Sequence, residues 1–238
     1  NIPLPEDIFL PVRKNSKGFD FTNRLERALL QQELAKIESK EWQAIPMIAG
    51  RKLSRDLLQT VMSPQQPAYA IGSVQQATLD DVEVALNQAK LAFELWSKKP
   101  VEERASCLNR FADLLQANMS ELMVLTCREA GKTWSDGIAE VREAIDFCRY
   151  YAKKAQELMS SPQRFNGYTG ELNELSLHPR GTILCISPWN FPLAIFTGQV
   201  VAGLVTGNCV IAKPAEQTPL IAAYAVKLMH QAGIPEGV

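Results

Sequence analysis

Two short segments near the C-terminal end of the sequence contain the residue types best suited to chemistry. Residues 187–192 read Ser-Pro-Trp-Asn-Phe-Pro, and residues 213–219 read Lys-Pro-Ala-Glu-Gln-Thr-Pro. Trp189 offers a large apolar face, Lys213 an ammonium group and Glu216 a carboxylate. Together these three side chains could hold a nucleoside by packing against it and by hydrogen bonds to its ribose hydroxyls.

The first segment also contains an amide side chain. Asn190 is the residue type that donates a hydrogen bond to a developing oxyanion in acyl chemistry. The glycine-rich fingerprints G-x-G-x-x-G and G-x-x-x-x-G-K-[ST] do not accompany either segment, so the sequence offers no phosphate cradle of the usual kind. Both segments are equally consistent with ordinary strand-to-helix connectors, in which proline and threonine are common.

A parallel α/β unit is expected to carry both segments. The continuous apolar run at residues 182–186 predicts a strand buried on both faces, and the helix after it has Pro192 in its first turn. A second buried strand is predicted at residues 209–212, followed by a helix that Thr218 caps. In such a sheet the carboxyl ends of the strands are where ligands bind.

A helical block is predicted upstream of this unit. Thr78 and Asp81 have the capping-box spacing at the start of one helix, and Asn118 and Glu121 repeat that spacing at another. Apolar residues then recur at helical spacing over residues 138–159, which predicts a long helix with a narrow apolar seam. A coiled coil and a helix packed on its own domain both fit the seam, and the second is favoured because systematic paired charges are missing.

The remaining segments have weaker patterns. Residues 1–60 read as a connecting region with a short helix at 25–37, and a β-type stretch follows at 68–73. After Pro162 imperfect alternation up to Pro179 predicts an exposed hairpin or arm.

Composition excludes several classes of protein. The 238 residues have 25 basic and 26 acidic side chains, a net charge of −1 and no long run of one sign, so no nucleic-acid binding by this region is expected. The apolar stretch at residues 193–205 is too short and too polar to span a bilayer. A start at Asn1 without a basic and then apolar leader argues against a signal peptide and suggests an excised piece.

The cysteines support neither a disulfide framework nor a zinc site. The five are widely spaced and form no C-x-x-C pair: Cys107, Cys127, Cys148, Cys185 and Cys209. Only two histidines accompany them. We therefore expect reduced cysteines that act as small buried hydrophobes, no metal, and a cytoplasmic location.

The two polar segments also match a known family. The run from Thr182 to Val238, with PWNFP and then KPAEQTP, strongly resembles the NAD(P)-dependent aldehyde dehydrogenase superfamily. The resemblance extends upstream through the helices that contain DDVEVAL and EVREAIDFCRYYA, so it covers about residues 45–238. The IDFCRYYA pattern and the leading NIPLPEDIFLPVRKNSKGFDF segment look most like the glutamate γ-semialdehyde (1-pyrroline-5-carboxylate) dehydrogenase module of bifunctional bacterial proline utilization A proteins.

This resemblance implies an α/β fold, namely the N-terminal part of the aldehyde dehydrogenase fold. Residues 46–238 would comprise a helical block, the start of a Rossmann-like parallel sheet, and a β arm at about 163–180 that mediates homo-oligomerisation. Residues 1–45 would be a linker after an upstream, absent proline dehydrogenase module. That module alone would use FAD and could give the parent protein a peripheral membrane association.

The resemblance also implies residue roles. Six residues would line the adenosine end of NAD: Ile186, Ser187, Pro188, Trp189, Lys213 and Glu216. Lys213 and Glu216 would bond the ribose hydroxyls, and the carboxylate would favour NAD over NADP by repelling a 2′-phosphate. Asn190 would stabilise the oxyanion, Phe191 would line the aldehyde channel, and Glu140 would approach the amino end of the substrate. For Glu140 a solvated helix glutamate is an equal alternative.

The sequence departs from the family pattern at the nucleophile. In this family a cysteine thiolate attacks the aldehyde and a glutamate activates the hydrolytic water, and both lie downstream of residues 213–219. None of the five cysteines stands in that context. The chain is therefore expected to be the front part of a catalytic domain, inactive alone, whose parent oxidises glutamate γ-semialdehyde to glutamate with NAD in proline catabolism.

Two alternatives remain open. One is another aldehyde dehydrogenase, such as one for succinate semialdehyde, because the residues that grip the substrate carboxylate are expected beyond Val238. The other is a non-catalytic nucleotide-binding or assembly module built on the same strand-end segments.

Overall fold

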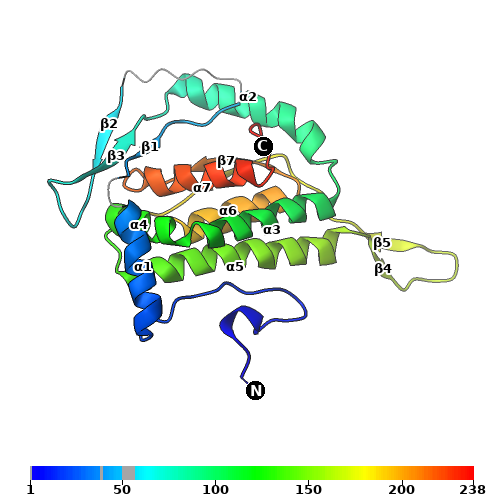
Figure 1. Ribbon diagram of the computed structural model, residues 1–238. Coiled ribbons are helices and arrows are strands. Elements are labelled where there is room, and N and C mark those ends of the chain that lie inside the picture. Colours follow the sequence, from blue (N-terminus) through cyan, green and yellow to red (C-terminus); the bar gives the residue numbers. More distant parts are fainter. Residues whose placement is uncertain (1, 38–39, 50–56) are drawn as a thin grey trace.

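A computed structural model describes residues 2–37, 40–49 and 57–238, and its centre is a set of roughly aligned helices (Figure 1). Four of them form the predicted helical block: α2 (Leu79–Trp96), α3 (Val101–Ala117), α4 (Met119–Ala130) and α5 (Trp134–Met159). Helix α5 packs along α3 on one side and along α6 (Ala194–Val205) on another. The apolar seam of α5 is buried from Ile138 to Ala155, so the helix packs on its own domain as predicted.

The predicted parallel unit is confirmed. Strands β6 (Thr182–Ile186) and β7 (Cys209–Lys213) pair in parallel, α6 connects them, and α7 (Pro219–Gln231) follows β7. The end of α6 is marked by Gly207, whose φ of +88° lies in the left-handed region that a glycine adopts without strain.

The prediction that the first strand is buried on both faces is wrong. Leu184 and Ile186 are each 60% exposed, whereas Cys185 between them is buried. Side chains alternate between the two faces of a strand, so Leu184 and Ile186 share one face. That face is left open at the carboxyl end of the strand, and an apolar run alone does not distinguish one covered face from two.

Two predicted helix caps have different outcomes. The Thr78–Asp81 capping box is present, with the Asp81 amide 3.2 Å from the Thr78 hydroxyl and the Thr78 amide 2.6 Å from the Asp81 carboxylate. The box predicted at Asn118 is absent, because its amide nitrogen donates to the Leu114 carbonyl and its oxygen accepts from the Tyr224 hydroxyl. A distant tyrosine thus competes successfully with the local cap.

A small sheet lies at one end of the helices. Strand β1 (Trp42–Ala44) pairs in parallel with β3 (Ala70–Val74), and β2 (Gln59–Met62) pairs antiparallel with β3. Strand β1 falls in the predicted linker but pairs with a strand beyond residue 45. The division of the chain at that residue stays a prediction.

The N-terminal segment lies along the helical block below α5 in Figure 1. It contains a short 3-10 helix, η1 (Pro5–Asp7), and the predicted helix is found as α1 (Arg24–Ile37). The backbone amide and hydroxyl of Ser16 both donate to Asp146 of α5, at 2.7 and 2.8 Å. These bonds hold the segment against α5.

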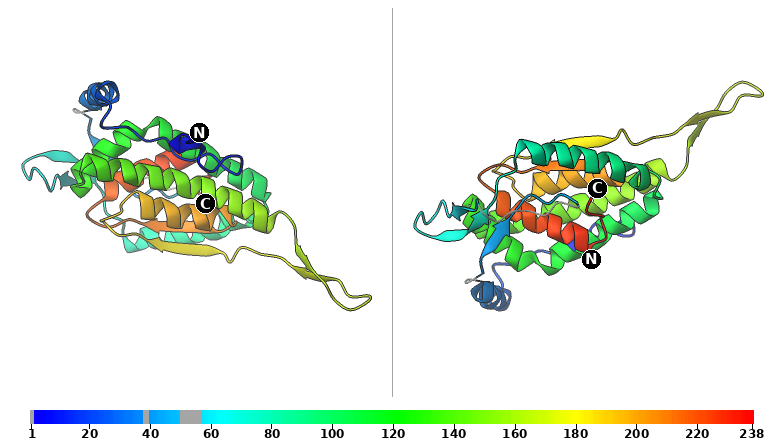
Figure 2. Two further views of the ribbon diagram at one scale, coloured as in Figure 1. Left: turned by 90° about the horizontal axis from the view of Figure 1, so that it is seen from below. Right: turned by 90° about the horizontal axis from the view of Figure 1, so that it is seen from above.

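The predicted arm is a long hairpin that projects from the end of α5 (Figure 2). Its strands β4 (Gln163–Phe165) and β5 (Asn173–Leu175) pair antiparallel, and every residue of both is exposed. Among the described helices, none is long and apolar enough to span a membrane.

Candidate functional site

The two polar segments begin side by side at the carboxyl end of the parallel pair. Ile186, the last residue of β6, is in register with Lys213, the last residue of β7. The Ser187 amide continues the ladder by donating to the Lys213 carbonyl at 3.1 Å. Loop 187–193 and loop 214–218 therefore leave the same edge of the sheet, as the sequence predicted.

Apolar and charged side chains are both exposed to solvent at this edge. Ile186 and Trp189 are 60% and 56% exposed and offer apolar surface. The Lys213 ammonium lies 2.7 Å from the Glu216 carboxylate, and both side chains are exposed. The hydrogen bond from Lys213 lowers the pKa of Glu216, so this carboxylate is charged at neutral pH.

Ser187 differs from its neighbours. Its side chain is buried, and its hydroxyl donates to the Gln199 side chain on α6 at 3.1 Å. Pro188 is half-buried. A contact between Ser187 and a cofactor stays a prediction, and its hydroxyl is committed to a bond inside the protein.

Asn190 lies exposed on loop 187–193, and its side chain forms no hydrogen bond with any residue that the structure describes. An uncommitted amide at a strand end is what an oxyanion donor requires. Next to it, the Phe191 ring lies 4.3 Å from the ammonium of Lys132, which is in the turn between α4 and α5. Loop 187–193 is thus in contact with the helical block.

The structure excludes one of the two alternatives that the sequence left open for Glu140. Its side chain is 1% exposed and forms an ion pair of 2.9 Å with Lys132, so the solvated alternative is wrong. One carboxylate oxygen accepts from the amides of Leu193 and Ala194, at 3.2 and 2.9 Å. Glu140 therefore caps α6, and a contact with substrate stays a prediction that these bonds do not support.

Glu143 is the exposed carboxylate near this pair. It lies on α5 one turn beyond Glu140. Partial desolvation raises its pKa, the negative charge of Glu140 raises it further, and the positive charge of Lys132 opposes both. The sequence did not single out this residue.

A second buried carboxylate, Glu129 at the end of α4, was also missed. Its two oxygens accept from the amides of Leu220 and Ile221 at 2.6 and 2.9 Å, so Glu129 caps α7. Burial raises its pKa to about 8, and the two amide bonds partly oppose that rise. The prediction that Thr218 caps this helix is wrong, because its buried hydroxyl has no partner among the described residues.

The cysteine thiols fit the expected role of small hydrophobes. Four are buried and Cys127 is half-buried. Burial raises the pKa of Cys127 and of Cys209 to about 11, and it also raises the pKa of Cys148 and Cys185. A thiol with a raised pKa carries little thiolate at neutral pH and is a poor nucleophile.

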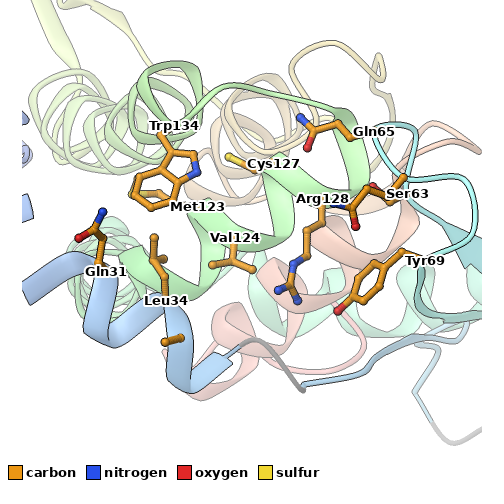
Figure 3. Close-up of a pocket in the computed structure, with 12 residues that line it drawn as sticks. Gln31, Leu34, Ser63, Gln65, Tyr69, Met123, Val124, Cys127, Arg128 and Trp134 are labelled. Carbon is orange, nitrogen blue, oxygen red and sulfur yellow. The ribbon is translucent and has the colours of Figure 1, made fainter. Parts of the chain in front are cut away.

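A cavity of about 540 Å³ lies elsewhere, between α1, α4 and the loop that joins β2 to β3 (Figure 3). Figure 3 shows Arg128, Cys127 and Trp134 around it. No predicted site residue lines this cavity. Among the described residues, no group of three or more His, Cys, Asp or Glu side chains could hold a metal ion.

Comparison with known proteins finds a family match over most of the chain. Residues 54–238 match the aldehyde dehydrogenase family. The chain is 43% identical over 237 residues to the bifunctional protein PutA of Klebsiella aerogenes, covering 100% of this chain and 17% of that protein. The chain thus spans about a sixth of the length of this relative.

Two solved structures are similar to the fold. Proline utilization A from Bdellovibrio bacteriovorus superposes with a TM-score of 0.90 at 34% identity, covering 99% of this chain and 24% of that one. 1-Pyrroline-5-carboxylate dehydrogenase from Thermus, solved with bound NAD, superposes with a TM-score of 0.86 at 33% identity, covering 94% of this chain and 44% of that one. The helical block and the strand-end loops are therefore similar to parts of these two longer proteins.

Proposed function

This chain belongs to the aldehyde dehydrogenase family, a family of oxidoreductases, and from that membership we propose that its parent protein oxidises glutamate γ-semialdehyde to glutamate with NAD. The observation that carries the proposal is the joint placement of Asn190 and the Lys213–Glu216 pair at one edge of the parallel sheet. The similarity to 1-pyrroline-5-carboxylate dehydrogenase and to proline utilization A supports this substrate over a generic aldehyde.

The residues at the sheet edge fit the adenosine part of NAD. Ile186 and Trp189 present exposed apolar surface to a purine, and Pro188 stiffens the loop between them. Lys213 and Glu216 offer a donor and an acceptor for the ribose hydroxyls. The charged Glu216 carboxylate would repel a 2′-phosphate, so NAD is favoured over NADP.

The oxyanion donor in this scheme is Asn190. When a thiolate adds to the aldehyde carbon, the carbonyl π electrons move to the oxygen, and the Asn190 amide would donate a hydrogen bond to that anion. NAD supplies the acceptor for the hydride that leaves the same carbon. The cysteine nucleophile and the glutamate that activates water would come from sequence outside this chain, so the chain alone is expected to be inactive.

The aldehyde would approach along Phe191, whose ring is held near Lys132. Glu140 was the candidate for the amino end of the substrate. Glu140 is buried and caps α6, so a role in substrate binding rests on the family resemblance alone.

The arm supports a proposal of homo-oligomerisation. A two-stranded hairpin is marginally stable on its own, and this one exposes the side chains of Phe165, Tyr168 and Leu172. A second copy of the protein would cover them. The parent is also proposed to be cytoplasmic, with FAD confined to a proline dehydrogenase module that can associate with membranes.

The test uses a protein that contains this chain together with a complete aldehyde dehydrogenase module. NAD reduction is followed by absorbance with glutamate γ-semialdehyde, succinate semialdehyde and a simple aliphatic aldehyde. The proposal expects the highest kcat/KM with glutamate γ-semialdehyde. Asn190→Ala is expected to lower turnover by roughly 10²-fold or more, because an oxyanion donor is lost.

Other outcomes would redirect the assignment. Preference for succinate semialdehyde would keep the assignment as an aldehyde dehydrogenase but change the proposed substrate. No reduction with any aldehyde would overturn the enzyme and favour a nucleotide-binding or assembly module. An unchanged turnover in Asn190→Ala would remove that residue from the chemistry.

A further inference from the structure

We propose that Glu129 and Glu140 are positioning residues that act on different parts of the site: Glu129 places the cofactor-binding loop 214–218, and Glu140 places residues 190–193, the end of loop 187–193 that contains Asn190. The inference rests on the proposed function for what each loop binds. Both carboxylates are buried and bonded to backbone amides, so each acts on its loop through the backbone.

Glu140 reaches loop 187–193 from α5. Its Oε2 atom accepts from the amides of Leu193 and Ala194, where the loop becomes α6. Its other oxygen pairs with Lys132, whose ammonium lies 4.3 Å from the centre of the Phe191 ring. One carboxylate therefore fixes the end of the loop directly and its middle through Lys132.

Glu129 has the corresponding place behind loop 214–218. Its two oxygens divide the amides of Leu220 and Ile221 between them, at the start of α7. The loop between β7 and these amides is short and begins and ends with a proline, Pro214 and Pro219. Because the loop is short and its prolines restrict the backbone, a shift of the first turn of α7 would also move Lys213 and Glu216.

The two helices depend on these carboxylates because their own N-cap residues do not cap them. Leu193 has no side-chain acceptor, and Thr218 accepts no amide. The first amides of a helix need hydrogen-bond acceptors when they are buried, and a carboxyl group keeps acceptor oxygens whether or not it is ionised. The helical block supplies both partners from a single stretch of chain, since only the turn after α4 and the start of α5 separate Glu129 from Glu140.

The experiment shortens each carboxylate by one methylene in the protein that contains the complete module. Glu129→Asp is expected to weaken NAD binding about 10-fold by calorimetry, with kcat within about twofold of wild type. Glu140→Asp is expected to lower kcat about 10-fold, with the calorimetric Kd for NAD within about twofold, because the start of loop 187–193 is held by the sheet ladder and by the bond between Ser187 and Gln199 rather than by Glu140. Displacing loop 214–218 thus changes the Kd for NAD, whereas displacing Asn190 changes kcat.

Conservative and control variants separate positioning from folding. Glu140→Gln keeps one oxygen that can accept both amides, so it is expected to recover most of the kcat lost in Glu140→Asp. Glu121→Gln changes a mostly buried carboxylate on α4 that bonds Trp42 and Tyr224, away from both loops. It is expected to lower the midpoint of urea unfolding without changing kcat or the Kd for NAD.

The outcomes distinguish this inference from the function on which it rests. A wild-type protein that neither binds NAD nor reduces it would defeat the proposed function. A wild-type protein that does both, with Asp variants that change kcat and Kd in parallel or change neither, would overturn the positioning roles alone. Should an Asp variant fail to fold, the Met variant at the same position, which has a similar volume but accepts no amide, provides the same comparison of constants.

Discussion

Helices α6 and α7 each follow one of the two site loops, but the glutamates that cap them have different electrostatic surroundings. Each begins at a buried glutamate from the helical block, and each ends where an arginine of α3 bonds its last carbonyls: Arg104 to Val205 at 2.9 Å and Arg110 to Ala232 at 2.8 Å. At the start of α6, Lys132 balances the charge of Glu140. At the start of α7, no cation among the described residues pairs with Glu129.

The same helix cap can therefore be made with two kinds of electrostatics. A buried ion pair is insensitive to small changes of pH but fails when one partner is removed. A buried carboxyl group that bonds only backbone amides does not depend on a cation, but its charged form is unfavourable in the protein interior.

The largest effect is expected from removing the counter-charge of Glu140. Lys132→Met leaves that carboxylate charged, buried and unpaired, which costs about 3–5 kcal/mol. Urea unfolding of the protein measures the loss. The double variant Lys132→Met with Glu140→Gln should recover part of it, and a single variant as stable as wild type would show that the pair does not stabilise α6.

Glu129 should make stability depend on pH. Its pKa is about 8 when folded and 4.5 by its ordinary value, so the folded protein binds the proton more tightly. Its contribution to stability is therefore full below about pH 4.5 and is lost as the pH rises to about 8, by a few kcal/mol in all. Glu129→Gln does not titrate, so its urea midpoint should fall less than that of wild type between pH 5 and pH 9. Equal slopes would contradict the raised pKa.

The C-terminal ends of the two helices should differ by a smaller amount. Arg104 is buried and bonds carbonyls of both Val205 and Lys99, whereas Arg110 is exposed. Arg104→Met is expected to cost about 2–3 kcal/mol because buried carbonyls lose their donors. Arg110→Met should cost about 1 kcal/mol, since water can replace it. The thermal midpoints of the two variants check the order, and the reverse order would contradict it.

The smallest effect on stability is expected at the exposed pair on loop 214–218. Lys213→Met breaks the ion pair with Glu216, and exposed pairs of this kind contribute about 0–1 kcal/mol. The thermal midpoint should stay close to that of wild type while NAD binding weakens. A large loss of stability would mean that the pair serves the fold rather than the cofactor.

The sequence predicted those parts of the molecule that depend on local patterns. The long helix α5, the Thr78 capping box, the parallel pair of strands and the exposed arm all follow from neighbouring residues. The loops came together at one sheet edge because parallel strands place their carboxyl ends there.

The parts that were missed depend on contacts between distant segments. Glu129 caps an amide 91 residues away, and no local spacing indicates that. Thr218 has the residue type of a cap but not the bond, and Asn118 bonds Tyr224 in place of a local amide. The exposed face of β6 likewise depends on which helices cover the sheet.

The proposed function requires that loops 187–193 and 214–218 bind the cofactor. Hydrogen–deuterium exchange of the protein with and without NAD tests this requirement residue by residue, because bound ligand slows exchange where it contacts or stabilises the backbone. We predict slower exchange at residues 186–194 and 213–221, with no change along the arm or around the cavity of Figure 3. Protection centred on residues 63–69 and 123–128 that spares the two loops would contradict cofactor binding at the sheet edge.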